Sequence, residues 1–79
     1  MLSFPEFIRS TRLNRGLTLT RCAEISGIST WRWRWLERSI PTHPPSPEDA
    51  RRIATTLDVP LRDVYAAAGV VLDEAAAHI

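Results

Sequence analysis

The chain has 79 residues, enough for one domain, and its 44% apolar and 24% charged residues are typical of a globular protein rather than a disordered one. The single cysteine excludes an internal disulfide, and no apolar run approaches the roughly 20 residues of a membrane span, so a cytoplasmic protein is expected. The net charge of +1 is unevenly placed: residues 1–38 hold seven arginines and three acids, whereas residues 39–79 hold three arginines and six acids. This polarity predicts an electropositive face on the N-terminal half.

The first helix is predicted from a capping box at its start. Ser3 and Glu6 have the capping-box spacing, and Pro5 suits the first turn of a helix. The helix should end near Arg15, with Gly16 as its left-handed cap. Its apolar side chains are expected to share one side of the helix: Phe4, Phe7, Ile8 and Leu13.

Two further short helices are predicted around a tight turn at Gly27, where a positive φ is least costly for glycine. Thr18 is expected to cap a second helix that runs to about Ser26. Ser29 is expected to cap a third helix that runs through Arg38. Apolar residues fall where a perpendicular helix pair needs them: Leu19, Cys22, Ile28, Trp33 and Leu36. This layout is that of a helix-turn-helix, whose second helix lies in the major groove of DNA.

The second half of the chain is predicted to hold a stiff loop and two more helices. Residues 39–47 contain four of the six prolines, so no helix should cross them. Ser46, followed by a proline and two acids, starts a fourth helix. That helix carries one apolar face: Ala50, Ile53, Ala54 and Leu57. A fifth helix is expected to start at Pro60, with Asp58 capping or preceding it, and to end at Gly69. Its inner residues are expected to be Leu61, Val64, Tyr65 and Ala68.

No strand pattern competes with these helices, so the chain is predicted to be all-α, with five short helices in residues 1–69 and a tail in residues 70–79. The tail opens with three apolar residues, Val70, Val71 and Leu72. It should therefore either cover the core or form a dimer seam with the fifth helix. No effector-binding or cleavable second domain is expected.

On a helical wheel of about 100° per residue, the third helix divides into two faces. Trp33 and Leu36 fall together and are expected to face the core. The side chains expected on the outer face are Thr30, Trp31, Arg34, Trp35 and Arg38. This composition suits DNA, because arginine can donate two hydrogen bonds to guanine and a hydroxyl can either donate or accept. An indole edge can pack against a thymine methyl group or against the sugar-phosphate wall.

Other chemistries find little support in the sequence. Cys22 is expected to be a small core residue rather than a reactive thiol. His43 and His78 lack metal-ligand spacing with it, so no metal site is expected. There is no glycine-rich phosphate loop and no catalytic constellation of carboxylates, serine and histidine, so neither an enzyme nor a cofactor is predicted.

Over roughly residues 4–69 the chain resembles the phage Cro and lambda-repressor-like helix-turn-helix family, also called the XRE family. The resemblance is carried by Arg12, Gly16-Leu17-Thr18, Ala23-Glu24, Ser26-Gly27-Ile28-Ser29 and Leu36-Glu37-Arg38, and farther on by Pro45 to Ala54 and Leu57-Asp58-Val59. It implies a five-helix lambda-repressor-like bundle that binds duplex DNA sequence-specifically, usually as a two-fold dimer on a palindromic operator. The chain departs from the family pattern at Trp33, where Val or Ile is usual, at Leu19, where Gln is frequent, and at Ser39, where Gly often ends the third helix.

The resemblance also implies roles for individual residues. Base contacts are expected from Thr30, Trp31, Arg34 and Trp35. Phosphate contacts are expected from the start of the second helix and around the third helix and its following loop: Thr18, Thr20, Arg21, Ser29, Arg38, Thr42 and His43. A semi-buried ion pair is expected between Arg12 and Glu37, joining the first and third helices.

The expected function is that of a Cro-like or minimal phage or mobile-element repressor, acting in the cytoplasm at the nucleoid without a cofactor, metal or membrane. Its expected partners are a double-stranded DNA operator and a second copy of itself. Two alternatives remain open. The protein could be the antitoxin of a toxin–antitoxin pair, or an adaptor that presents Trp31 and Trp35 to another protein, because Trp and Arg are also preferred anchors of protein interfaces.

Overall fold

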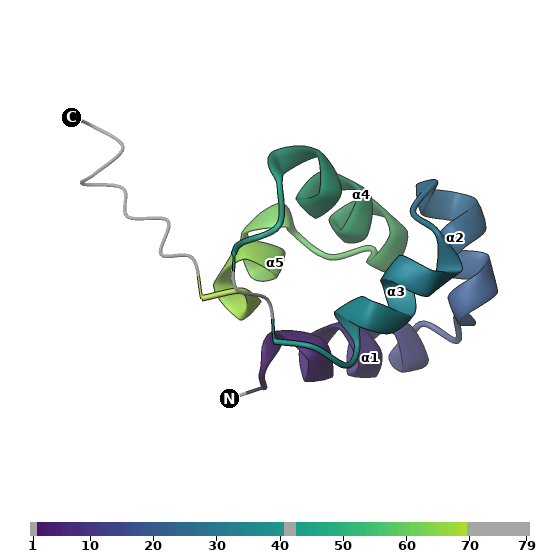
Figure 1. Ribbon diagram of the computed structural model, residues 1–79, viewed down its shortest axis with the longest axis horizontal. Coiled ribbons are helices and arrows are strands. Elements are labelled where there is room, and N and C mark those ends of the chain that lie inside the picture. The colour runs from purple at the N-terminus through teal and green to yellow at the C-terminus, as the bar shows by residue number, and fades with distance from the viewer. Residues whose placement is uncertain (1, 41–42, 70–79) are drawn as a thin grey trace.

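The computed structural model describes residues 2–40 and 43–69 (Figure 1). Its five α-helices are α1 (Phe4–Asn14), α2 (Leu19–Ser26), α3 (Thr30–Leu36), α4 (Pro47–Leu57) and α5 (Leu61–Ala67). In Figure 1, α4 and α5 lie on one side of the bundle, α2 and α3 lie on the other, and α1 runs along the lower edge. The helix α4 packs against α5 and α2, while α1 contacts α3 and α5. No strand occurs in the described residues, so the predicted all-α bundle is confirmed.

All five helices contribute to one hydrophobic core. Its buried residues are Phe4, Ile8, Cys22, Ile28, Trp33, Ala50, Ile53, Ala54, Leu57 and Val64. The four residues predicted for one face of α4 are all among them, and Leu19 and Leu36 pack against the cluster while remaining partly exposed. Trp33 is the largest of the fully buried side chains. The helix α3, which is the second helix of the predicted helix-turn-helix, is therefore anchored in the core by a tryptophan rather than by a smaller aliphatic residue.

Side-chain caps fix where four of the helices begin, as the sequence predicted. Ser3 and Glu6 form the capping box of α1. The hydroxyls of Thr18, Ser29 and Ser46 each accept a backbone N–H from the first turn of α2, α3 and α4. Because such a cap satisfies an N–H group that has no partner within the helix, it makes the starting residue of each helix specific.

The bounds of two helices differ from the prediction. The helix α3 ends at Leu36 instead of Arg38, because the Arg38 N–H bonds the carbonyl of Trp35, only three residues back, and this tightens the last turn. The helix α5 runs over Leu61–Ala67, so it is shorter at both ends than expected. Asp58 precedes α5, as one of the two expectations had it, and does not cap it: its φ of 55° makes it the left-handed residue that ends α4, a conformation that aspartate tolerates better than most residues.

Two leucines expected on the inner side of their helices are exposed. Leu13 is 54% exposed because it lies five positions after the buried Ile8, which is about 140° around the helix. Leu61 is 37% exposed because it is the first residue of α5 and lies at the rim of the bundle. The tail predicted for residues 70–79 lies outside the described residues.

Cys22 is fully buried in the core, and burial raises the pKa of its thiol. Since the thiolate is the reactive form, we expect alkylation by iodoacetamide to proceed only through unfolding of the chain. Mass spectrometry of the alkylated fraction, with and without urea, measures this difference. Equal rates in the two conditions would show that the thiol is accessible in the folded protein.

Candidate nucleic-acid interface

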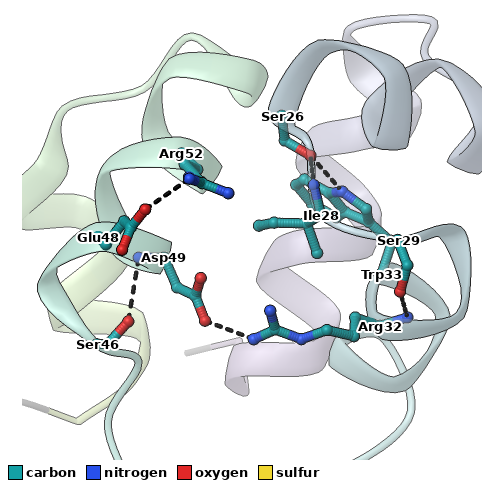
Figure 2. Close-up of polar contacts among 9 residues, drawn as sticks. All are labelled: Ser26, Ile28, Ser29, Arg32, Trp33, Ser46, Glu48, Asp49 and Arg52. Carbon is teal, nitrogen blue, oxygen red and sulfur yellow. Dashed lines mark hydrogen bonds and ion pairs between the residues drawn. The ribbon is translucent and has the colours of Figure 1, made fainter.

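The turn between α2 and α3 is held by both backbone and side chain. Gly27 has a φ of +76° and donates its N–H to the carbonyl of Ala23. The Ser26 hydroxyl accepts two hydrogen bonds, one from the Ile28 N–H and one from the Trp33 indole Nε1–H, each at 2.9 Å (Figure 2). The indole bond fixes α3 to the last residue of α2. Sequence analysis did not find this role of Ser26, since nothing in the spacing shows that the indole nitrogen points back to the turn.

The three tryptophans of α3 divide as the helical wheel predicted. Trp33 is fully buried, whereas Trp31 is 69% exposed and Trp35 is 57% exposed. The two exposed indole rings stack on each other with their centroids 6.1 Å apart and an interplanar angle of 16°. The stack was not predicted, although the four-residue spacing of the two rings is the one at which helical side chains are neighbours. The exposed side of α3 therefore carries one continuous aromatic surface.

The outer face of α3 is bordered by two hollows on the side of α2. Thr30 and Arg34 line the first together with the start of α2, including Thr18 and Thr20. Arg34 also lines the second, whose other residues are Arg9, Leu19, Glu37 and Arg38. Thr30 is half-buried, less outward than expected, while Arg34 is exposed. The second hollow thus brings three arginines together beside α3.

The aromatic surface borders a different hollow, between α3, α4 and the proline-rich loop. Trp31 and Trp35 line it with His43, Pro44 and Pro45. The volume of this cavity is ≈ 380 Å³. Of the two loop residues expected to contact phosphates, His43 is exposed at this edge, and Thr42 lies outside the described residues. The outer face of α3 thus has an edge with arginines toward α2 and an aromatic edge toward the loop.

The remaining side chains expected at the phosphate backbone are exposed around the start of α2 and both ends of α3. They are Thr18, Thr20, Arg21, Ser29 and Arg38. The hydroxyls of Thr18 and Ser29 already serve as helix caps. Thr18 and Thr20 share one hollow with Arg34, and Arg38 shares the other.

Arg12 of α1 and Glu37 after α3 form the ion pair that the resemblance implied. Arg12 donates from Nε to Oε2 of Glu37 at 2.5 Å and from Nη2 to Oε1 at 2.9 Å, and its Nη1 donates to the Leu17 carbonyl at 2.8 Å. The side chains are only 12% and 7% exposed. The hydrogen bonds to Glu37 raise the pKa of the Arg12 guanidinium. This pair fastens the end of α3 to α1.

A second ion pair, which sequence analysis missed, fastens the start of α3 to α4. The Arg32 Nη2 lies 2.5 Å from the Asp49 Oδ2 (Figure 2). The two residues are 17 positions apart, on either side of the proline-rich loop, so no local spacing could have indicated the contact. With Arg12–Glu37 at one end and Arg32–Asp49 at the other, the orientation of α3 is fixed at both ends.

The short helix α2, the glycine turn and the exposed second helix α3 together define a helix-turn-helix protein. A family model described as a helix-turn-helix domain matches residues 4–68, and the chain belongs to this family, of the Cro and lambda-repressor-like kind. No curated protein and no solved structure matches the chain. Membership in the family makes the protein a DNA-binding regulator in general terms.

The described residues hold neither a membrane-spanning helix nor a cluster of metal-binding side chains. Within residues 2–40 and 43–69, no helix is long and apolar enough to cross a membrane. In the same part of the chain, no group of three or more His, Cys, Asp or Glu side chains could hold a metal ion.

Proposed function

We propose that this protein is a transcriptional repressor that recognises a specific DNA sequence through α3 and binds a palindromic operator as a homodimer. The observation that carries the proposal is the exposed outer face of α3, where Trp31, Arg34 and Trp35 all point away from the core. Side chains that reach base edges from a helix in the major groove are the source of sequence specificity in helix-turn-helix proteins.

The other groups around α3 fit contacts to the DNA backbone. Thr18 and Thr20 lie at the N-terminus of α2, whose unpaired N–H groups and positive dipole end favour a phosphate. Arg21 and Arg38 add positive charge near the two ends of the helix pair. Ser29 and His43 are exposed near the start of α3 and in the loop that follows it. Phosphate contacts of this kind would set the register of α3 on the duplex without reading its sequence.

The proposal is tested by comparing a duplex selected from a random pool with a scrambled duplex of the same length near physiological salt. A repressor of this kind typically binds its specific site at least about a thousandfold more tightly than other DNA. Sedimentation of the complex then gives its stoichiometry, and two chains per palindromic duplex are expected. Equal affinity for both duplexes would contradict sequence-specific binding, and one chain per palindrome would contradict the dimer.

Replacing Arg34 with alanine should weaken binding to the selected duplex by about 1–3 kcal/mol and relax specificity at one base pair, because a forked contact to guanine is lost. Titrations followed by tryptophan fluorescence measure both effects. The matched control is Arg62→Ala, which removes an exposed arginine from α5 and should leave affinity unchanged. An equal loss on all duplexes would instead assign Arg34 to a phosphate.

A protein-docking adaptor is the second candidate, favoured by the exposed stack of Trp31 and Trp35. Exposed aromatic residues are preferred anchors of protein interfaces. The same experiment separates the two functions: an adaptor would bind DNA weakly with no sequence preference, and its Trp31→Ala variant would retain that weak binding.

The antitoxin and phage or mobile-element interpretations stay predictions, which a toxin gene or phage genes beside the coding sequence would support.

A further inference from the structure

We propose that Trp31 and Trp35 form a reader of pyrimidine C5-methyl groups in the major groove, an inference that rests on the proposed function and specifies what the aromatic edge of α3 recognises. The two rings are stacked, exposed and carried by adjacent turns of α3. They therefore present one apolar surface to a partner that binds the outer face of α3.

The chemistry of indole restricts what this surface can read. An indole has one hydrogen-bond donor and no acceptor, so it cannot match the donor and acceptor patterns that distinguish most base pairs. The C5-methyl group of thymine is the apolar feature that an unmodified base pair displays in the major groove, and 5-methylcytosine carries a methyl group on the same ring atom. Two stacked rings are thus suited to methyl groups and poorly suited to cytosine or to purine edges.

The dimensions of the stack agree with bases two steps apart on one strand. Residues four apart on a helix are separated by about 6 Å along its axis, and stacked bases of one strand by about 3.4 Å, so the surface covers about two base steps. The measured separation of the ring centroids, 6.1 Å, is of this size. The expected target is a pair of pyrimidines two base steps apart on one strand that both carry the methyl group.

The surroundings of the stack favour DNA over a protein as its partner. On the helical wheel Arg34 and Arg38 fall on the same outer face of α3 as the two tryptophans, so a partner that covers this face meets both arginines as well as the rings. Among the described residues neither arginine pairs with a carboxylate. Glu37, the acid nearest to them in sequence, is already held by Arg12. DNA is a polyanion that displays apolar methyl groups in its major groove. It therefore complements both the arginines and the aromatic rings of this face.

The test replaces each thymine of the selected duplex with deoxyuridine, one at a time, which removes the methyl group and leaves the polar edge unchanged. At two positions, two base steps apart on one strand, we expect binding to weaken about fourfold each, the factor that corresponds to burial of one methylene-sized group. In each of the variants Trp31→Ala and Trp35→Ala, the thymine and uracil duplexes should bind with equal affinity at one of these positions. Arg34→Ala is the matched control: its binding is weaker, but the difference between thymine and uracil persists.

A second arm of the experiment separates the two sources of the methyl group. Cytosine is placed at a contacted thymine position with and without its C5-methyl group, each paired with guanine. If the duplex with 5-methylcytosine binds more tightly than the duplex with cytosine, the tryptophan pair also recognises methylated DNA. If the two duplexes bind equally, the pair recognises thymine alone. A protein that selects a sequence but shows no difference between thymine and uracil, or shows the same difference in both tryptophan variants, overturns the inference while leaving the proposed function intact. A protein that selects no sequence overturns both.

Discussion

Replacing Glu37 with alanine should lower the free energy of unfolding by about 3–5 kcal/mol, because it leaves the Arg12 guanidinium without its carboxylate in a site that water hardly reaches. A chain of this size is expected to have a total stability of only about 4–12 kcal/mol. The loss is therefore a large part of what holds the protein folded. Urea denaturation followed by circular dichroism measures it.

The matched control for this variant is Glu48→Ala, which breaks a Glu–Arg pair of the same chemistry on the surface of α4. Glu48 and Arg52 are 71% and 44% exposed, so their pair is expected to contribute less than about 1 kcal/mol. Equal urea midpoints for the two variants would contradict the structural role assigned to the Arg12–Glu37 pair.

Replacing Trp33 with alanine should cost about 3–5 kcal/mol, since it empties the position of the largest fully buried side chain. The substitution also removes the indole donor that bonds the Ser26 hydroxyl at the turn between α2 and α3. We therefore expect a lower unfolding midpoint and a loss of DNA binding that follows the loss of folded protein. Thermal and urea melts measure the first effect.

Trp35→Ala provides the control for the same residue type on the same helix. Trp35 is 57% exposed, so its removal should change stability by no more than about 0.5 kcal/mol while altering DNA recognition. If Trp33→Ala and Trp35→Ala melted alike, the division of α3 into an inner and an outer face would be wrong.

The parts of the fold that could be predicted from the sequence are those that depend on neighbouring residues. Ser3, Thr18, Ser29 and Ser46 cap helices because each precedes a first turn whose N–H groups need acceptors. Gly27 adopts the left-handed conformation expected of it. The helical period likewise predicted that Trp33 is buried while the tryptophans two positions away on either side are exposed. Local chemistry and periodicity were enough for these features.

The contacts that could not be predicted join residues far apart in the chain. Arg15 at the end of α1 donates hydrogen bonds to the carbonyls of Leu57 and Asp58, where α4 ends, over more than 40 residues. Arg32 reaches Asp49 across the proline-rich loop. Such pairs depend on how the helices pack, and several arginines could have served equally well by sequence alone. The stack of Trp31 and Trp35 differs from these contacts. It could have been predicted, because the two residues are four positions apart on one helix and are therefore neighbours on its surface.

Site selection from a random duplex pool near physiological salt tests most directly whether α3 reads DNA sequence. We expect enrichment of an inverted repeat whose half-sites lie about 10 base pairs apart, the spacing that two α3 helices in successive major grooves require. The Arg34→Ala protein should enrich a more degenerate version of the same repeat. A pool that stays random, although the protein binds it in a salt-dependent way, would show that only the DNA backbone is recognised and would contradict sequence reading by α3.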